Sequence, residues 1–330
     1  MKRLVSLAAA ATVAACAAAH ADSAPDCTLK EFASLDIAFD GGAMTVPVKI
    51  ANADRRMMID LAVPDTGVRE SLANELQLRQ LDLPGGIAGV TYAGDKVAKQ
   101  VVLPDFQIGR IKVENAKVLM FGGNKLPPDV VGILGTGLFD KLDAEIDFKK
   151  AKLNLFSPDH CEGNVVYWTD TFASFPFRLG AIHQTYLRAE MDGKTVKTSF
   201  ATTDEHSSMM LSAAKQLFDL TPDSPGMTVA ARNTDGTPSV YRYPFKQMLF
   251  GGVAINNPAI DIVVDTGPRC NGTVILDRGD FKTCYGAVDV YLGFNVLRKL
   301  HLYIASDERT LYITAADASA PPVPAPSKTP

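Results

Sequence analysis

The sequence predicts an all-β chain built from two copies of one unit. Between residues 35 and 315, short alternating apolar patterns are separated by turn signals, and long helical periods are rare. The second half repeats the order of patterns found in the first half. The chain has 330 residues, of which 47% are hydrophobic and 21% charged, so it is long enough to form two domains with separate cores.

Residues 1–21 have the pattern of a secretory signal peptide. Lys2 and Arg3 precede an apolar run, and small residues follow it in Ala19-His20-Ala21. The run is shorter than the about 20 residues that a membrane-spanning helix needs. A second cleavage site stays open, because Cys16 follows Val-Ala-Ala and resembles the lipid-anchored cysteine of a bacterial lipobox. We therefore expect export to the periplasm or cell envelope, with secretion and lipid anchoring as further alternatives.

Four cysteines follow this leader, and export makes disulfides chemically permissible. Three pairings are open to four cysteines. Cys27 and Cys161 bracket the first half, and Cys270 and Cys284 are 14 positions apart, so we expect the pairs 27–161 and 270–284. No Cys-x-x-Cys motif and no ligand spacing of histidines occurs, so we expect neither a metal nor another cofactor.

Charge and hydropathy argue against nucleic acid as a partner and against a transmembrane segment. The formal net charge is −4 and no run is rich in Lys and Arg, which argues against nucleic acid. No second apolar run reaches the length of a transmembrane helix. Residues 316–330 consist mainly of Pro, Ala and Ser and are predicted to be a disordered tail.

Each half begins with a β-hairpin that leads into a loop and a short helix. The alternating apolar residues of 46–50 and 57–60 predict the first hairpin, and 72–78 the first helix. The second half has the same order after a shift of 141 positions. Its hairpin strands and helix are predicted at 187–191, 198–201 and 211–218.

The ends of the halves align without gaps at a larger shift. Gly132 to Leu142 matches Val290 to Leu300 at a shift of 158 positions, and a closing hairpin follows in both halves. The larger shift places an insertion at 265–289 of the second copy, and both Cys270 and Cys284 lie in it. After an N-terminal segment at 22–34, the predicted lobes are 35–161 and 162–315.

These paired halves resemble the retropepsin-like and pepsin-like aspartic peptidases, in particular exported bacterial proteins with two retropepsin-like lobes. In that family each lobe has a hairpin that ends in two hydrophobic residues and Asp-Thr/Ser-Gly, and later a hydrophobic-hydrophobic-Gly motif. Ile133-Leu134-Gly135 and Tyr291-Leu292-Gly293 match the later motif. The resemblance implies a bilobal acid-protease-like fold, in which two duplicated β-barrel lobes flank a cleft.

The catalytic motif of that family is incomplete in this chain. Asp60 stands at the aspartate position of the first copy, followed by Leu61 and Ala62, whereas Ala201 stands at this position in the second copy. The mechanism needs two carboxylates about 3 Å apart, one to activate water and one to donate a proton. In the family, threonine hydroxyls also bond across the two loops, which Leu61 and Ala62 do not reproduce. The sequence therefore predicts a degenerate catalytic pair.

Other acids are candidates to replace the missing carboxylate. Asp204 lies just after the vacant position. Two literal Asp-Thr-Gly triplets begin at Asp65 and Asp265, but neither follows a predicted hairpin end directly, and the triplet is a common turn sequence. Tyr92 and Gly94 fall at the expected turn of the first flap hairpin, where they are candidates to cover the cleft.

The leading hypothesis for function is a monomeric protein that binds an extended peptide or protein segment in the interlobe cleft without cleaving it. The first alternative is an active aspartic endopeptidase, in which Asp60 acts with Asp204 or in which Asp65 acts with Asp265. The second alternative is a structural lipoprotein of the envelope, anchored through Cys16.

Overall fold

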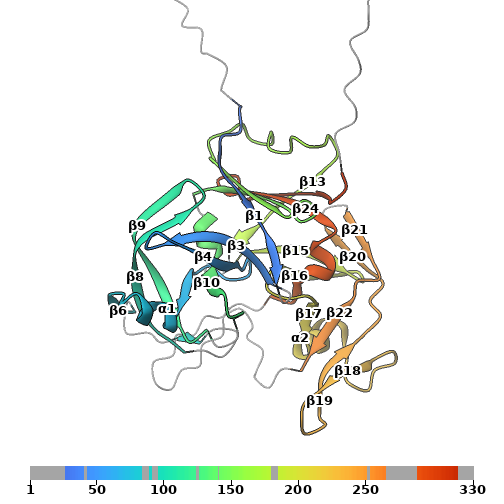
Figure 1. Cartoon of the computed structure of the whole chain (residues 1–330). Helices are drawn as coiled ribbons and strands as arrows, with labels where there is room; N and C mark the ends of the chain where they lie inside the picture. The colour runs from blue at the N-terminus through green and yellow to red at the C-terminus, as the bar shows by residue number, and fades with distance from the viewer. Residues whose placement is uncertain are drawn as a thin grey trace, which may run out of the picture.

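The described strands form three β-sheets in the computed structural model (Figure 1). The leader with Cys16, the flap residues Tyr92 and Gly94, and the insertion with Asp265, Cys270 and Cys284 lie outside the described residues, as do the last 12 residues of the tail. The described residues are 27–40, 43–83, 89–90, 96–123, 126–139, 141–179, 185–250, 253–264 and 288–318.

The first lobe is built on a nine-stranded sheet with the order β2-β3-β4-β10-β5-β9-β8-β6, where β7 also pairs with β8. Helix α1 (Glu70–Glu75) follows β5, and the short 3-10 helix η2 (Thr136–Phe139) follows β10. The strands are β2 (Ala38–Asp40), β3 (Ala43–Ile50), β4 (Ala53–Ile59), β5 (Gly67–Arg69), β6 (Gln80–Asp82), β7 (Gly89–Val90), β8 (Lys96–Ile108), β9 (Ile111–Phe121) and β10 (Val130–Leu134).

The second lobe is built on a ten-stranded sheet with the order β18-β19-β22-β17-β23-β16-β15-β20-β21, where β14 also pairs with β15. Helix α2 (Leu211–Phe218) follows β17, and α3 (Phe294–Leu297) follows β23. The strands are β14 (Arg178–Leu179), β15 (Thr185–Met191), β16 (Lys194–Phe200), β17 (Ser207–Met210), β18 (Thr228–Arg232), β19 (Pro238–Arg242), β20 (Gln247–Phe250), β21 (Val253–Asn256), β22 (Ile260–Val263) and β23 (Val290–Leu292).

A six-stranded sheet joins the two lobes. Its order is β1-β12-β11-β24-β25-β13, so three neighbouring strands come from each half of the chain. The halves meet where β11 pairs with β24 in antiparallel register. The strands are β1 (Glu31–Asp36), β11 (Asp143–Asp147), β12 (Lys152–Phe156), β13 (Ala173–Pro176), β24 (Leu300–Ala305) and β25 (Thr310–Ala315).

Backbone hydrogen bonds repeat in both halves at the predicted shifts. The N–H of Thr136 donates to the carbonyl of Val63 (2.8 Å), and the N–H of Phe294 donates to that of Asp204 (2.9 Å). The donors are 158 positions apart and the acceptors 141, as the sequence alignment requires. In each half the strand before the donor residue also runs parallel to the last strand of the first hairpin, as β10 does to β4 and β23 does to β16. The all-β fold with two duplicated lobes is therefore confirmed.

Two element boundaries differ from the predictions. Helix α1 spans 70–75 instead of 72–78, because Gln77 takes a left-handed conformation (φ 49°) that ends the helix before Leu78. The first strand begins at Glu31, inside the predicted N-terminal segment, because β1 pairs with β12 as part of the joining sheet. The predicted span of α2 is confirmed at both ends, and Asp219 follows it in a left-handed conformation (φ 57°).

The predicted disulfide between Cys27 and Cys161 is present, with a Cα to Cα distance of 4.8 Å. It ties the chain before β1 to the segment after β12, so it closes the first half covalently. The second predicted pair, Cys270 with Cys284, lies outside the described residues.

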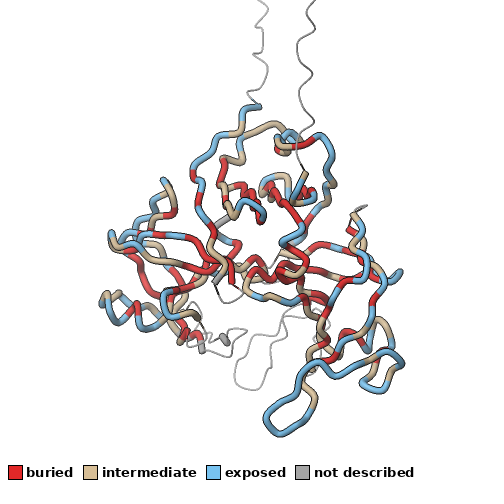
Figure 2. The backbone as a smooth tube through the Cα atoms, turned by 45° about the vertical axis from the view of Figure 1, so that its right-hand side comes forward, coloured by how far each residue is buried: buried red, intermediate tan, exposed pale blue. Residues whose placement is uncertain are grey.

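Burial is concentrated where the three sheets meet, and the hairpin of β18 and β19 extends away from this centre (Figure 2). One hydrophobic cluster runs through both lobes and the inner side of the joining sheet. Every residue of β18 is exposed. Among the described residues, no helix is both long enough and apolar enough to cross a membrane.

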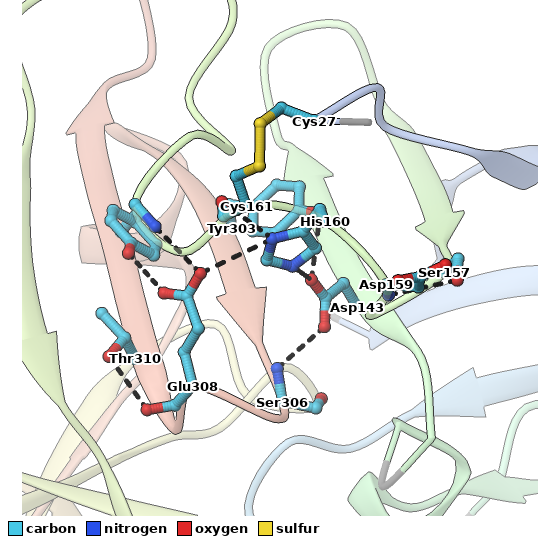
Figure 3. A network of polar contacts seen from close by, with 12 residues as sticks. Cys27, Asp143, Ser157, Asp159, His160, Cys161, Tyr303, Ser306, Glu308 and Thr310 are labelled. Atoms are coloured by element: carbon cyan, nitrogen blue, oxygen red, sulfur yellow. Dashed lines mark hydrogen bonds and ion pairs between the residues drawn. A yellow bond between two sulfur atoms is a disulfide. The ribbon is translucent and has the colours of Figure 1, made fainter. Parts of the chain in front are cut away.

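A buried polar network lies at one end of the joining sheet, near the disulfide (Figure 3). His160 Nε2 is 2.6 Å from Asp143 Oδ2, and that carboxylate also accepts hydrogen bonds from the Tyr303 hydroxyl (3.2 Å) and the Ser306 N–H (2.9 Å). Glu308 lies on the other side of the His160 ring, with Oε1 3.6 Å from Nδ1. Because Asp143 belongs to the first half and Tyr303 to the second, these contacts hold the halves together.

Candidate functional site

Two loops occupy equivalent places at the junction of the lobes. The N–H of Asp60, after β4, donates to the carbonyl of Leu134 (3.0 Å). The N–H of Ala201, after β16, donates in the same way to the carbonyl of Leu292 (2.9 Å). Ala201 is therefore the structural counterpart of Asp60, and its methyl group is buried.

Asp60 carries an unusual carboxyl group. Burial raises the pKa of Asp60 to about 6, although the Ala62 N–H, which donates to Oδ1 at 2.8 Å, acts to lower this pKa. The nearby charge of Asp204 raises the pKa of Asp60 further. Asp60 therefore holds a proton in mildly acidic solution, where an ordinary aspartate is ionised.

Thr202 connects the two loops directly. Its Oγ1 donates a hydrogen bond to the carbonyl of Ile59 (2.7 Å) and accepts one from the N–H of Leu61 (3.1 Å). Thr202 is completely buried, so water cannot replace these bonds. The second lobe thus keeps a crossing hydrogen bond of the kind that the family resemblance implies.

The reciprocal crossing bond is missing. Leu61 follows Asp60 as Thr202 follows Ala201, and its buried side chain has no hydroxyl to send back. Sequence reasoning noted the loss at Leu61 but missed the bond made by Thr202. The signal was available, because Thr202 is the threonine that follows the vacant aspartate position.

Two glycines allow the loops to pack against the following strands. A Cβ on Gly135 would lie 2.5 Å from the carbonyl oxygen of Asp65, and one on Gly293 would lie 2.5 Å from the carbonyl carbon of His206. Both distances are too short for any side chain, so the hydrophobic-hydrophobic-Gly motif is required by backbone packing on both sides of the junction.

Of the candidate substitute acids, Asp204 is the one whose charge raises the pKa of Asp60. Its charge contributes to the raised pKa of Asp60, and its own pKa is raised because the surrounding protein partly removes it from water. Its backbone carbonyl is fixed by the Phe294 N–H. Among the hydrogen bonds of the described residues, none joins the Asp60 and Asp204 carboxyls, so the two groups do not share a proton in this structure.

The triplet at Asp65 has a structural place in the chain. The carbonyl of Asp65 packs against Gly135, and Thr66 Oγ1 accepts a hydrogen bond from the Gly135 N–H (3.3 Å). Gly67 then begins β5. Asp65 itself is exposed, and the other triplet residue, Asp265, lies outside the described residues.

The described site offers the carboxyl of Asp60, the nearby carboxyl of Asp204 and the polar groups around them. Asp60 can donate or accept one proton near pH 6, and Asp204 adds a second negative charge nearby. Within the described part of the chain, no group of three or more His, Cys, Asp or Glu residues is arranged to hold a metal ion.

Comparisons with known proteins support the two-lobed fold. Residues 46–138 match the aspartyl protease family. No curated protein sequence matches the chain. Among solved structures, an aspartic proteinase from Irpex lacteus is similar over 86% of this chain and 97% of its own, with a TM-score of 0.54 and 10% sequence identity.

Two basic 7S globulins are similar at a lower TM-score. Basic 7S globulin from soybean has a TM-score of 0.46 at 11% identity, covering 88% of this chain and 96% of its own. Conglutin gamma, a basic 7S globulin from lupine seeds, has a TM-score of 0.47 at 9% identity, covering 87% and 95%. At the identity of the Irpex lacteus enzyme, the likeness establishes the two-lobed fold alone.

Proposed function

Since the chain is an aspartyl-protease-like protein with a pepsin-like fold, we propose that it holds an extended peptide or protein segment between its lobes without cleaving it. The observation that carries this proposal is the equivalence of Ala201 with Asp60, each fixed by the same backbone hydrogen bond. The position that supplies the second carboxylate in the family mechanism therefore holds a methyl group.

Peptide hydrolysis by this mechanism needs a proton donor and a water-activating carboxylate at once. At any pH, a single carboxyl such as that of Asp60 can take only one of these two roles. Since no second carboxyl of the described residues is hydrogen-bonded to Asp60, its proton can be donated to a ligand instead. Below pH about 6 the protonated carboxyl can donate to a peptide carbonyl, and above this pH the donor is lost.

Binding is supported by the way the junction is held. Thr202 fixes the Asp60 loop through two hydrogen bonds, so the loop keeps its conformation although the reciprocal bond is missing. β-rich surfaces bind extended chains readily, because backbone groups of the ligand pair with strand edges. A site with one fixed carboxyl and neighbouring strands can therefore retain affinity after losing the second catalytic acid.

A second candidate function is favoured by one observation. Asp204 raises the pKa of Asp60, so its carboxyl lies near enough to act on it electrostatically. Substrate binding that brings the two carboxyls into hydrogen-bond contact would create a proton-sharing pair. The protein would then be an aspartic endopeptidase that uses Asp60 and Asp204.

One experiment separates the two functions. The purified mature protein is incubated with a denatured protein substrate from pH 3 to 7, together with the variants Asp60→Asn and Asp204→Asn and the matched control Asp65→Asn. We expect no cleavage by any of them, and saturable binding of peptides from a library whose dependence on pH around 6 is absent in Asp60→Asn. Cleavage that disappears in both Asp60→Asn and Asp204→Asn, but not in Asp65→Asn, would establish the endopeptidase.

We also propose that the protein is exported. The leader pattern of residues 1–21 and the disulfide between Cys27 and Cys161 support this, because such disulfides persist in oxidising compartments. The mass of the mature N-terminus tests it. A chain beginning at Asp22 is expected for ordinary cleavage, a lipidated Cys16 would establish the anchored form, and a retained Met1 would contradict export.

A further inference from the structure

A cavity of about 440 Å³ lies between the second lobe and the joining sheet. Its walls come from β15 and β16 on one side and from β24, β25 and the turn between them on the other. Leu61 and Thr136 reach it from the first lobe. Its volume lies in the range of about 300 to 1,000 Å³ that is typical of small-molecule sites.

Aromatic rings fill the equivalent junction of the first lobe. Phe294, the first residue of α3, packs edge-on against Phe148 and Phe39, with ring centroids 6.2 Å and 5.3 Å apart. Phe294 and Phe148 are both buried. The contact between the first lobe and the joining sheet is therefore a packed aromatic cluster.

The internal duplication identifies what replaces two of these rings at the cavity. Ser306 corresponds to Phe148, because the registers of β11 with β12 and of β24 with β25 coincide after a shift of 158 positions. Thr136 corresponds to Phe294, because their N–H groups make equivalent bonds at the same shift. Both short residues line the cavity. The hollow thus lies where the other half of the molecule holds two phenyl rings.

The wall from β16 is also shorter and more polar than its counterpart. Thr198 and Ser199 correspond to Met57 and Met58, because the pairings of β16 with β23 and of β4 with β10 coincide. Thr198 is completely buried, and its Oγ1 has no hydrogen-bond partner among the described residues. A buried hydroxyl without a partner is unfavourable in a finished core. Two independent features therefore distinguish this junction from its packed equivalent.

The cavity has a cation among its lining residues. Arg309 lies in the turn between β24 and β25, is exposed, and forms no ion pair with the described residues. Asp307 lines the cavity from the same turn, so the net charge there is small. Selectivity for an anion must then come from hydrogen bonds donated by the guanidinium, whose planar donors match a carboxylate.

We propose that this cavity binds a small molecule that carries an aromatic ring and a carboxylate. The ring occupies the space that corresponds to Phe148 and Phe294 in the other half. The carboxylate accepts hydrogen bonds from Arg309. The site differs from the proposed peptide site at Asp60, because neither Asp60 nor Asp204 lines the cavity.

The test uses two probes with the same ring and chain, 3-phenylpropionate and its neutral amide, which differ in the charge and hydrogen bonding of the terminal group. Isothermal titration of the full mature protein is expected to give one saturable site, with the acid bound about tenfold more tightly than the amide. Arg309→Gln should reduce the affinity for the acid to that for the amide. The control Arg232→Gln removes an exposed arginine from the distant hairpin of β18 and β19 and should change neither affinity (Figure 1).

Ser306→Phe restores the residue that the first half has at this place and should abolish binding of both probes. The methyl signals of Ile304, which lines the cavity, report the site in wild-type protein without any substitution. Shifts of these signals that follow the titration support the proposal. Absence of saturable binding, equal affinity for acid and amide, or unchanged binding by a folded Ser306→Phe variant would overturn it.

Discussion

Replacing Thr202 by valine should destabilise the protein through the junction of its lobes. The change keeps the shape of the side chain but removes the hydroxyl that bonds to the Ile59 carbonyl and the Leu61 N–H. All three residues are buried, so both backbone groups lose a partner that water cannot replace. At about 1–3 kcal/mol for each of the two unsatisfied buried groups, the free energy of unfolding should fall by about 2–6 kcal/mol.

The assay is urea unfolding followed by intrinsic fluorescence and far-UV circular dichroism. Thr203→Val is the matched control, because the side chain of Thr203 is half-buried and no hydrogen bond is described for it. The control should stay within about 0.5 kcal/mol of wild type. Thr202→Ser keeps the hydroxyl and should recover most of the loss. If Thr202→Val is as stable as Thr203→Val, the crossing bond does not hold the junction.

Three further changes have defined outcomes. Peptide affinity in wild-type protein should fall as pH rises through about 6, and Asp60→Asn should remove this dependence in a binding titration. His160→Gln should lose most stability below pH about 6.5. Burial lowers the pKa of His160, but its contacts with Cys161 and Asp143 outweigh burial and raise this pKa above 6.5 in the folded protein. The loss of stability should shrink as pH rises through the raised pKa, and urea midpoints at several pH values measure it. Cys161→Ser should lower the free energy of unfolding by about 2–5 kcal/mol, and dithiothreitol should then lower the melting temperature less than it does in wild-type protein.

The duplicated fold could be predicted because it is written into the periodicity of each half. The shifts of 141 and 158 positions reappear as pairs of backbone hydrogen bonds, such as those made by Thr136 and Phe294. The disulfide between Cys27 and Cys161 followed from spacing and export in the same way. These features depend on local pattern and on the order of elements along the chain.

The details of the site depend on contacts that no local pattern contains. The Thr202 hydroxyl bonds to residues about 140 positions away. Its partners are backbone groups, which every residue except proline has, so the side chains at these positions do not indicate the bond. The effect of Asp204 on Asp60 likewise requires the two loops to be placed in space. The cavity beside Ser306 depends on how the joining sheet packs against the second lobe, at the position where the first half has Phe148.

The most direct test of the central claim is a single cleavage assay at acidic pH. The claim is that Asp60, opposed by Ala201, binds a peptide carbonyl and does not hydrolyse the bond. Mass spectrometry of a denatured protein incubated with the mature protein from pH 3 to 7 should detect no new peptide ends. New ends that are absent when the Asp60→Asn variant is used would contradict the account.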